Sequence, residues 1–337
     1  MRMLITGGAG FVGSHLAERL LNLGHEVDVL DDLSTGRLEN LSHLEANGRL
    51  RVTTGSVTDE GLLEPLLASA QVVFHLAAVV GVDLVLQSPV RTIETNVLGT
   101  TSVLRLASRH SIKVLLTSTS EVYGKGTRLP FSEDDDRLLG PTTRSRWCYS
   151  ESKAVDEFLA LAYRQEQGLP VVIARLFNTV GPRQTGRYGM VLPRFVSQAI
   201  AGEPLTVFGD GRQTRAFADV RDVVRALVRL SECAAAEGQV VNVGSGSEIT
   251  INDLARLVIQ VTGSNSSVQY VPYEQAHGDG FEETQRRVPD VARVKALIGW
   301  EASTPLQETI SAVVEEMSRA QAGGARPSQG GMQAEHS

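Results

Sequence analysis

A glycine-spaced turn near the start of the chain constrains its fold more than any other segment. Gly7, Gly10 and Gly13 follow an apolar run over residues 3–5, and a helical pattern covers residues 14–22. This spacing permits a tight turn, a close approach of backbone to a ligand, and close packing of helix on strand. The unpaired amides and the dipole of such a helix start favour bound phosphate. The sequence therefore predicts a strand, turn and helix that cradle a dinucleotide pyrophosphate.

An acidic residue at the end of the next expected strand indicates which dinucleotide binds. That strand covers residues 25–30 and is followed by Asp31, about twenty residues after the glycine turn. A carboxylate there accepts a hydrogen bond from the ribose 2′-hydroxyl and repels a 2′-phosphate. The sequence therefore favours NAD over NADP as cofactor. The alternative interpretation is that Asp31 only caps a loop.

Apolar, β-branched runs alternate with helical segments through the first half of the chain. Further strands are expected at residues 50–54, 72–76, 113–117 and 171–175. This alternation implies parallel βαβ units with both faces of the sheet covered. We expect an α/β protein with an NAD(P)-binding Rossmann domain, built on a doubly wound parallel sheet, over residues 1–180. A smaller C-terminal α/β substrate-binding domain, partly interleaved with the first, is expected over 181–320, and a disordered tail over 321–337.

Charge and composition argue against several classes of function. The formal net charge is −7 and no basic face is evident, which argues against nucleic acid as a partner. Cys148 and Cys233 have no metal-ligand spacing, and the acidic run over residues 133–136 is interpreted as a solvated loop, so no metal is expected. Neither a signal peptide nor a run of membrane-spanning length is visible. We expect a soluble cytoplasmic protein that binds no membrane.

Tyr149 and Lys153 indicate the chemistry. They stand four residues apart and so share one face of a helix. An ammonium and a positive nicotinamide nearby stabilise the phenolate and lower the tyrosine pKa from about 10 toward neutrality. That suits a general base for a sugar hydroxyl. Hydroxyl side chains over residues 117–120 follow an expected strand and can hydrogen-bond the reacting oxygen. The alternative is an ordinary surface pair of tyrosine and lysine.

Taken together, these motifs resemble the extended short-chain dehydrogenase/reductase family of nucleotide-sugar enzymes, over residues 1–317. They are residues 7–13, 75–78 and 119–124, the Tyr149/Lys153 pair and Asn178. The resemblance implies an NAD that is reduced and reoxidised within one cycle, and a homodimer built by helices of the Rossmann domain. The cofactor-binding residues that it implies are Gly7, Gly10, Phe11, Val12, Gly13, Asp31, Val57, Leu76, Ala77, Ala78, Tyr149 and Lys153. Ser56 is a departure, because relatives often carry aspartate there, beside the adenine.

The triplet Thr119-Ser120-Glu121 narrows the reaction. It is similar to UDP-glucuronate decarboxylases, whereas dTDP-glucose 4,6-dehydratases carry aspartate where Ser120 stands. GDP-mannose dehydratases share the triplet. Residues 139–153 and 213–217 also resemble the decarboxylases. The catalytic residues that the resemblance implies are Thr119, Ser120, Glu121, Tyr149 and Lys153, and the substrate-binding residues are Asn178, Arg183, Arg215 and Arg287.

The predicted reaction starts with oxidation at C4 of a UDP-sugar. Tyr149 removes the hydroxyl proton while hydride passes to NAD. The ketone lies β to the C6 carboxylate, so loss of carbon dioxide gives an enolate that Thr119 and Tyr149 stabilise. Glu121 or Ser120 manages protonation at C5, and hydride return gives UDP-xylose. Three alternatives remain open: a 4-epimerase acting on UDP-glucose or UDP-glucuronate, a 4,6-dehydratase, and a non-catalytic NAD-binding module.

Overall fold

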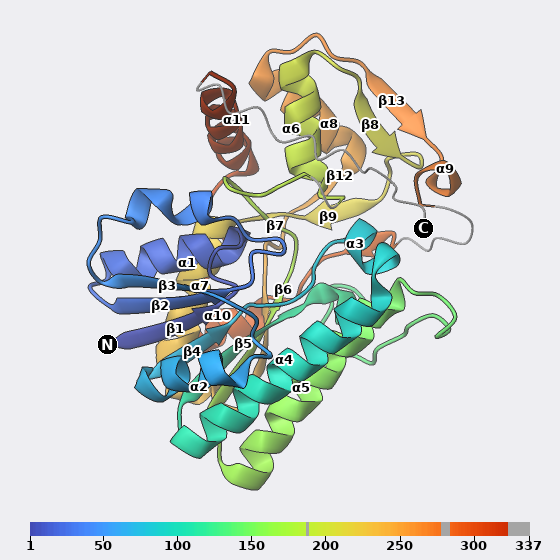
Figure 1. The fold of residues 1–337 in the computed structure, drawn as a ribbon. Coiled ribbons are helices and arrows are strands. Elements are labelled where there is room, and N and C mark those ends of the chain that lie inside the picture. Colours follow the sequence, from blue (N-terminus) through green and yellow to red (C-terminus); the bar gives the residue numbers. More distant parts are fainter. Residues whose placement is uncertain (187–188, 278–283, 323–337) are drawn as a thin grey trace, which may run out of the picture.

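A seven-stranded parallel sheet forms the centre of the molecule (Figure 1). The computed structural model describes residues 1–186, 189–277 and 284–322. The strand order is β11-β6-β5-β4-β1-β2-β3, so the chain reverses direction across the sheet between β1 and β4. The strands are β1 (Arg2–Thr6), β2 (Glu26–Asp31), β3 (Leu50–Thr54), β4 (Val72–His75), β5 (Lys113–Thr119), β6 (Val171–Leu176) and β11 (Val240–Val243).

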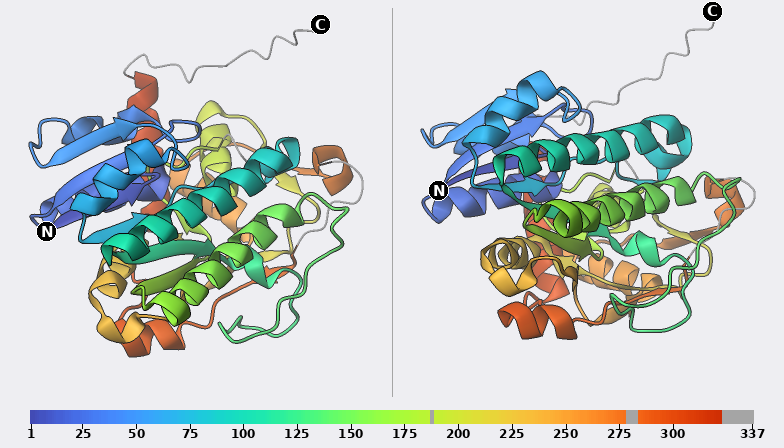
Figure 2. Two further views of the ribbon diagram at one scale, coloured as in Figure 1. Left: turned by 60° about the horizontal axis from the view of Figure 1, so that its bottom comes forward. Right: turned by 90° about the horizontal axis from the view of Figure 1, so that it is seen from below.

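Helices cover both faces of this sheet, as Figure 2 shows from two sides. One face packs on α2 (Glu60–Ser69), α4 (Pro89–His110) and α5 (Trp147–Gln167), with Leu4 and Val73 among the shared core residues. The other face packs on α1 (Phe11–Asn22), α7 (Val220–Glu232) and α10 (Ala292–Ile298). This confirms the predicted doubly wound α/β fold, whose strands are apolar because both sheet faces are buried.

A second layer lies above the sheet in Figure 1 and has its own apolar core, with Phe195, Leu254 and Ile310 at its centre. Its helices are α6 (Val191–Ala201), α8 (Ile251–Thr262) and α11 (Leu306–Ala322), with the short α3 (Val82–Gln87) and α9 (Tyr273–His277) at the rim. Its strands are β7 (Thr179–Val180), β8 (Leu205–Phe208), β9 (Thr214–Ala216), β10 (Ala218–Asp219), β12 (Glu248–Thr250), β13 (Val268–Val271) and β14 (Arg286–Arg287). In the described chain as a whole, the 3-10 turns are η1 (Leu38–Leu44), η2 (Ser120–Tyr123) and η3 (Ala234–Ala236).

The chain returns to the sheet layer after residue 180. Strand β11 pairs with β6, and α7 packs against α1. The domain boundary at residue 180 therefore stays a prediction, and the sheet domain also includes β11 and α7 from later in the chain. The expected tail overlaps the end of α11, because this helix continues to Ala322, and residues 323–337 lie outside the described part.

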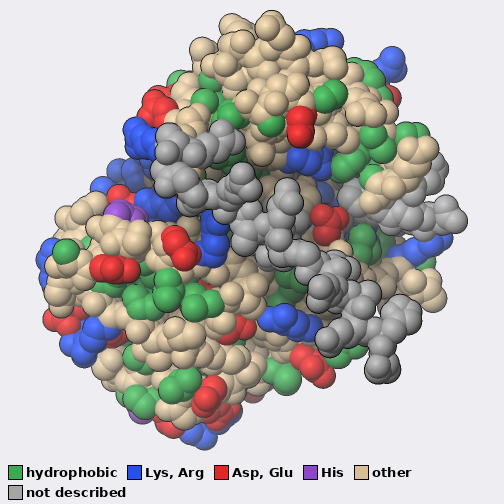
Figure 3. All heavy atoms as spheres, turned by 45° about the horizontal axis from the view of Figure 1, so that its top comes forward, with side chains coloured by type: hydrophobic (Ala, Val, Ile, Leu, Met, Phe, Trp, Pro, Cys, Tyr) green, Lys and Arg blue, Asp and Glu red, His purple; other side chains and the backbone are tan. Residues whose placement is uncertain are grey.

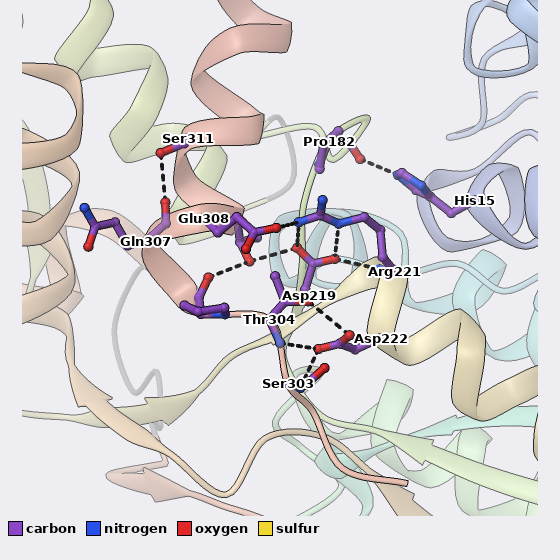
Figure 4. A network of polar contacts seen from close by, with 12 residues as sticks. His15, Pro182, Asp219, Arg221, Asp222, Ser303, Thr304, Gln307, Glu308 and Ser311 are labelled. Atoms are coloured by element: carbon purple, nitrogen blue, oxygen red, sulfur yellow. Dashed lines mark hydrogen bonds and ion pairs between the residues drawn. The ribbon is translucent and has the colours of Figure 1, made fainter.

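Two buried carboxylates at the start of α7 join α11 to the sheet layer (Figure 4). Asp219 accepts a hydrogen bond of 2.8 Å from the Thr309 hydroxyl. Asp222 accepts hydrogen bonds from the backbone amides of Ser303 and Thr304, both at 2.8 Å. Removing a buried acceptor leaves its donors unpaired, so these contacts fix where α11 lies.

The outer surface carries charges of both signs. In the view of Figure 3, basic and acidic side chains are interspersed over the face that is drawn. Within residues 1–186, 189–277 and 284–322, none of the helices combines the length and the apolar character that a bilayer crossing requires.

Candidate functional site

Two adjoining cavities open where the strands of the sheet end, close to the reversal between β1 and β4. The first cavity follows the glycine turn, and the second lies between the sheet layer and the layer above it. Phe11, Val12, Leu76 and Ala78 line both, so the two form one continuous cleft. Ligands of open α/β sheets bind in this crevice.

All the expected cofactor-binding residues lie along this cleft. Those that line the first cavity are Gly7, Gly10, Phe11, Val12, Gly13, Asp31, Val57, Leu76, Ala77 and Ala78. Tyr149 and Lys153 line the second cavity. Val57 is buried against the backbone of α4, since a Cβ on Gly99 would lie 2.6 Å from its Cγ1.

The glycine turn forms a cradle that side chains would fill. Gly7 has φ of +74°, and a Cβ there would lie 2.8 Å from the amide of Ala77. A Cβ on Gly13 would overlap the Gly7 carbonyl oxygen and lie 2.7 Å from Cα of Gly8. Helix α1 starts at Phe11, earlier than predicted, and its N-cap Gly10 supplies no side-chain cap. The turn thus brings bare backbone to the first cavity, which fits a pyrophosphate.

Asp31 serves the turn and lines the cavity as well. Its Oδ2 accepts from the Ala9 amide and its Oδ1 from the Leu33 amide, both at 2.9 Å. Burial raises the pKa of this carboxyl, while the two amides act in the opposite direction. Asp31 therefore does cap the backbone of neighbouring loops, as the alternative interpretation expected. Contact with a ribose hydroxyl is compatible with it and stays a prediction.

Arg183 lies beside the first cavity and does not line the second. Its guanidinium pairs with Glu18 on α1, and its amide donates to Glu316 Oε2 at 2.6 Å. The backbone of Arg183 is in the left-handed region, with φ of +66°. This position does not support the prediction that Arg183 binds substrate. It places Arg183 at the end of the cleft where the dinucleotide is expected.

The other predicted site residues meet around the second cavity. They are Thr119, Ser120, Glu121, Tyr149, Lys153, Asn178, Arg215 and Arg287. Helix α5 carries Tyr149 and Lys153 on consecutive turns, and Thr119 at the end of β5 hydrogen-bonds the tyrosine. Ser150 Oγ donates to the Glu121 carbonyl at 2.6 Å, which ties α5 to η2.

The protein's own groups raise the pKa of Tyr149. Burial raises the pKa of its phenol above the ordinary value, and the negative charges of Glu121 and Asp156 add to this effect. Lys153 Nζ donates to Asp156 Oδ2 at 2.8 Å. The predicted lowering of the tyrosine pKa combines Lys153 with the positive nicotinamide of bound NAD, and it stays a prediction.

Glu121 is surrounded by guanidinium groups. Arg287 Nη1 donates to its Oε1 at 2.6 Å, and Arg146 Nη2 lies 3.6 Å from its Oε2. Burial alone would raise the pKa of Glu121, but Arg287, Arg146 and Arg215 lower it to about 2. Glu121 is therefore ionised near neutral pH and holds no proton to donate.

Strand pairing explains how two of these arginines meet. Strands β9 and β14 run parallel, with Arg287 directly opposite Arg215. Arg146 comes from a third segment, as the N-cap of α5. The sequence interpretation did not select Arg146 as a site residue, although its place just before the Tyr149 helix was a usable signal.

The acidic run at residues 133–136 is not a solvated loop throughout. Glu133 is buried and its Oε1 accepts from the Asn242 amide at 2.8 Å. Asp135 Oδ2 accepts from the Ser132 amide at 2.8 Å. These carboxylates are used within the fold. Within the described ranges, no three His, Cys, Asp or Glu side chains gather in a way that could hold a metal ion.

Known proteins share this sequence and this architecture. The family model described as GDP-mannose 4,6 dehydratase matches residues 4–313. The chain is 43% identical to the UDP-N-acetyl-alpha-D-glucosaminuronate decarboxylase of Bacillus cytotoxicus, over 92% of this chain and 96% of that protein. It is 39% identical to UDP-glucuronic acid decarboxylase 1 of Danio rerio, over 94% of this chain and 73% of that protein. The solved UDP-glucuronic acid 4-epimerase from Bacillus cereus, in complex with UDP-glucuronic acid and NAD, superimposes with a TM-score of 0.85 at 27% identity, covering 95% of this chain and 99% of that one.

Proposed function

Because the chain belongs to the extended short-chain dehydrogenase/reductase family of NAD-dependent nucleotide-sugar enzymes, we propose that it decarboxylates UDP-glucuronate to UDP-xylose. One observation carries the proposal: the guanidinium groups of Arg146, Arg215 and Arg287 converge beside Tyr149. A sugar acid brings a carboxylate that such a group of cations recognises. The relatives with 38–43% identity are named as nucleotide-sugar uronate decarboxylases, which supports the same conclusion.

The first cavity fits the cofactor that this reaction needs. Gly7, Gly10 and Gly13 would hold the pyrophosphate of NAD, and Asp31 would meet the ribose nearest the glycine turn. NAD, when bound, supplies a hydride acceptor for C4 of the sugar and returns the hydride at the end of the cycle.

Tyr149 and Thr119 handle the oxygen at C4. The tyrosine takes the proton of the C4 hydroxyl, and Thr119, already hydrogen-bonded to it, orients the same oxygen. Once C4 is a ketone, the C6 carboxylate lies β to it. The bond between C5 and C6 breaks, carbon dioxide leaves, and the electron pair passes into an enolate whose oxygen both hydroxyl groups stabilise.

The second cavity divides the remaining tasks among its charged groups. Arg215 and Arg287 would orient the sugar acid before the bond breaks, a bidentate task that lysine performs poorly. Glu121 would keep the arginines in place as an ionised partner. Glu121 carries no proton near neutral pH, so Ser120 is the better of the two predicted proton donors to C5.

Incubation of the purified protein with NAD and UDP-glucuronate tests the proposal. We expect carbon dioxide and UDP-xylose, detected by trapping of labelled gas and by chromatography of the nucleotide sugars. UDP-glucose is the matched control, because it lacks the carboxylate. UDP-N-acetylglucosaminuronate tests whether a larger group at C2 is accepted. An epimer of UDP-glucuronate without carbon dioxide would overturn the proposal in favour of a 4-epimerase.

We also propose a homodimer that uses α4 and α5. These helices lie side by side on the outer surface (Figure 2). They also expose apolar side chains. Val90 is 67% exposed and Phe158 is 68% exposed, with Ile93, Leu98 and Val155 nearby on the same helices. Apolar surface of this kind favours burial against a second copy. Light scattering should give twice the chain mass, and Phe158→Glu should give a monomer.

A cytoplasmic location is part of the same proposal. Cys148 and Cys233 are both free thiols, and such thiols are typical of proteins in reducing compartments. Fractionation of cells that produce the protein, followed by an assay of each fraction, checks the location.

A further inference from the structure

A buried carboxylate, Asp156, pairs with the lysine of the Tyr149/Lys153 motif. Both belong to α5, and Lys153 Nζ donates to Asp156 Oδ2 at 2.8 Å. Asp156 is 0% exposed and Lys153 is 2% exposed. In the described part of the chain, Asp156 Oδ1 has no hydrogen-bond partner. A buried ion pair with an unfilled acceptor is weak evidence for a role in stability, which directs attention to its charge.

A line of buried polar side chains connects this ion pair with the first cavity. The Thr100 hydroxyl on α4 lies 3.0 Å from His75 Nε2 and acts to lower the pKa of Asp156. His75 Nδ1 lies 2.7 Å from Thr6 Oγ1, and that oxygen accepts from the amide of Ala77 at 3.3 Å. Ala77 lines the first cavity. These side chains therefore link the neighbourhood of Asp156 to the cofactor side of the cleft.

Several elements packed around Tyr149 bring charged or titratable groups close to it. The charged or titratable groups near the tyrosine, its lysine and Asp156 are Glu121 on η2, His75 on β4, Glu157 on α5 and Arg175 on β6, with Arg146, Arg215 and Arg287 around Glu121. Burial and the charge of Lys153 lower the pKa of His75 to about 3, so its ring is neutral. Arg175 pairs with Glu157 at 2.7 Å. Asp156 is then the carboxylate that directly opposes the Lys153 charge.

We propose that Asp156 is a positioning residue, which holds the Lys153 ammonium and offsets its charge at Tyr149, and so sets the pH at which the tyrosine becomes a base. This inference rests on the proposed function only in taking Tyr149 as the base. The ion pair and the ionisation of the tyrosine are independent of which sugar binds.

Asp156→Asn tests the proposal in the complex with NAD, whose positive nicotinamide favours the phenolate. Ultraviolet absorbance follows phenolate formation against pH, and subtraction of the matching Tyr149→Phe protein isolates this one tyrosine. We expect the midpoint to fall by about one pH unit in Asp156→Asn, since a like charge is removed. The low-pH limb of the activity profile should move in the same direction.

Two controls separate this effect from a loss of structure. Glu166→Gln removes the same charge from an exposed position on α5 and should leave the midpoint unchanged. Asp156→Glu keeps the charge and should retain the parent midpoint to within a few tenths of a pH unit. Asp156→Ala leaves room for water beside the ammonium and is the second test variant, with a fall of the same sign expected.

A midpoint in Asp156→Asn or Asp156→Ala that equals the parent's, or lies above it, overturns the proposal. An equal fall in Glu166→Gln does so too, because the effect would then be one of general charge. If the tyrosine shifts as expected but no sugar acid is consumed, the proposed reaction is wrong and the role of Asp156 stands.

Discussion

Glu121→Gln should cost stability at neutral pH and much less in acid. The folded protein lowers the pKa of Glu121 from 4.5 to about 2, chiefly because Arg287, Arg146 and Arg215 oppose the effect of burial. A carboxyl whose pKa falls on folding adds stability above its unfolded pKa, and this stability is lost as the pH falls through the folded value. The difference corresponds to about 3 kcal/mol at pH 7, of which about 2 kcal/mol is lost by pH 3. The Glu121 side chain is 18% exposed, so solvent screens the interaction only weakly.

Urea unfolding of the ligand-free protein measures this difference, with fluorescence of the buried Trp147 and Trp300 as the signal. The free energy of unfolding of parent and Glu121→Gln is compared at pH 7 and at pH 3. Glu166→Gln, an exposed acid on α5, is the control and should show no such change. A stability difference between parent and Glu121→Gln that is equal at the two pH values would refute the reasoning, because the arginines would then not hold Glu121 in its ionised form.

Three further changes test the cleft and its frame. Gly13→Ala adds a methyl that would overlap the Gly7 carbonyl, so NAD should bind about ten- to a hundredfold more weakly by calorimetry, and unaltered affinity would contradict the cradle. Tyr149→Phe removes the proposed base and should reduce turnover about 100- to 10,000-fold while NAD affinity stays within a few fold. Asp222→Ala leaves two backbone amides without their acceptor and should lower the free energy of unfolding by about 3 kcal/mol in urea; a loss below ~1 kcal/mol would show that these contacts do not fix α11.

The parts of the fold that the sequence predicted are those encoded in short stretches of chain. Gly7 and Gly13 need no distant partner to be interpreted, since their spacing already requires bare backbone at a helix start. The strands of the sheet are apolar because both faces are buried, so their positions along the chain are visible in composition. Tyr149 and Lys153 share a helix, and four residues of spacing suffice to place them together.

The parts that could not be predicted depend on contacts between distant segments. Arg215 and Arg287 are expected to bind substrate from the family resemblance alone, because the parallel pairing of β9 and β14 that makes them neighbours leaves no local pattern. Glu133 looks like part of a solvated acidic run, and only the fold shows that it accepts a hydrogen bond from the Asn242 amide. Both cases concern charged groups, whose burial is decided by tertiary structure and not by their own neighbours along the chain.

The same distinction applies to the chemistry of the site. A motif names the reacting group, but the protonation state of that group depends on charges that other segments bring to it. Lys153 lies beside the second cavity as predicted, and its ammonium pairs with Asp156. Glu121 also lies there, and the arginines keep it ionised. A tyrosine whose pKa is raised by burial stays protonated near neutral pH, and it can accept a proton only once nearby positive charge favours its phenolate. Under the proposed function, Tyr149 would therefore become a base only when NAD is bound, and it would not take a proton before a hydride acceptor is in place.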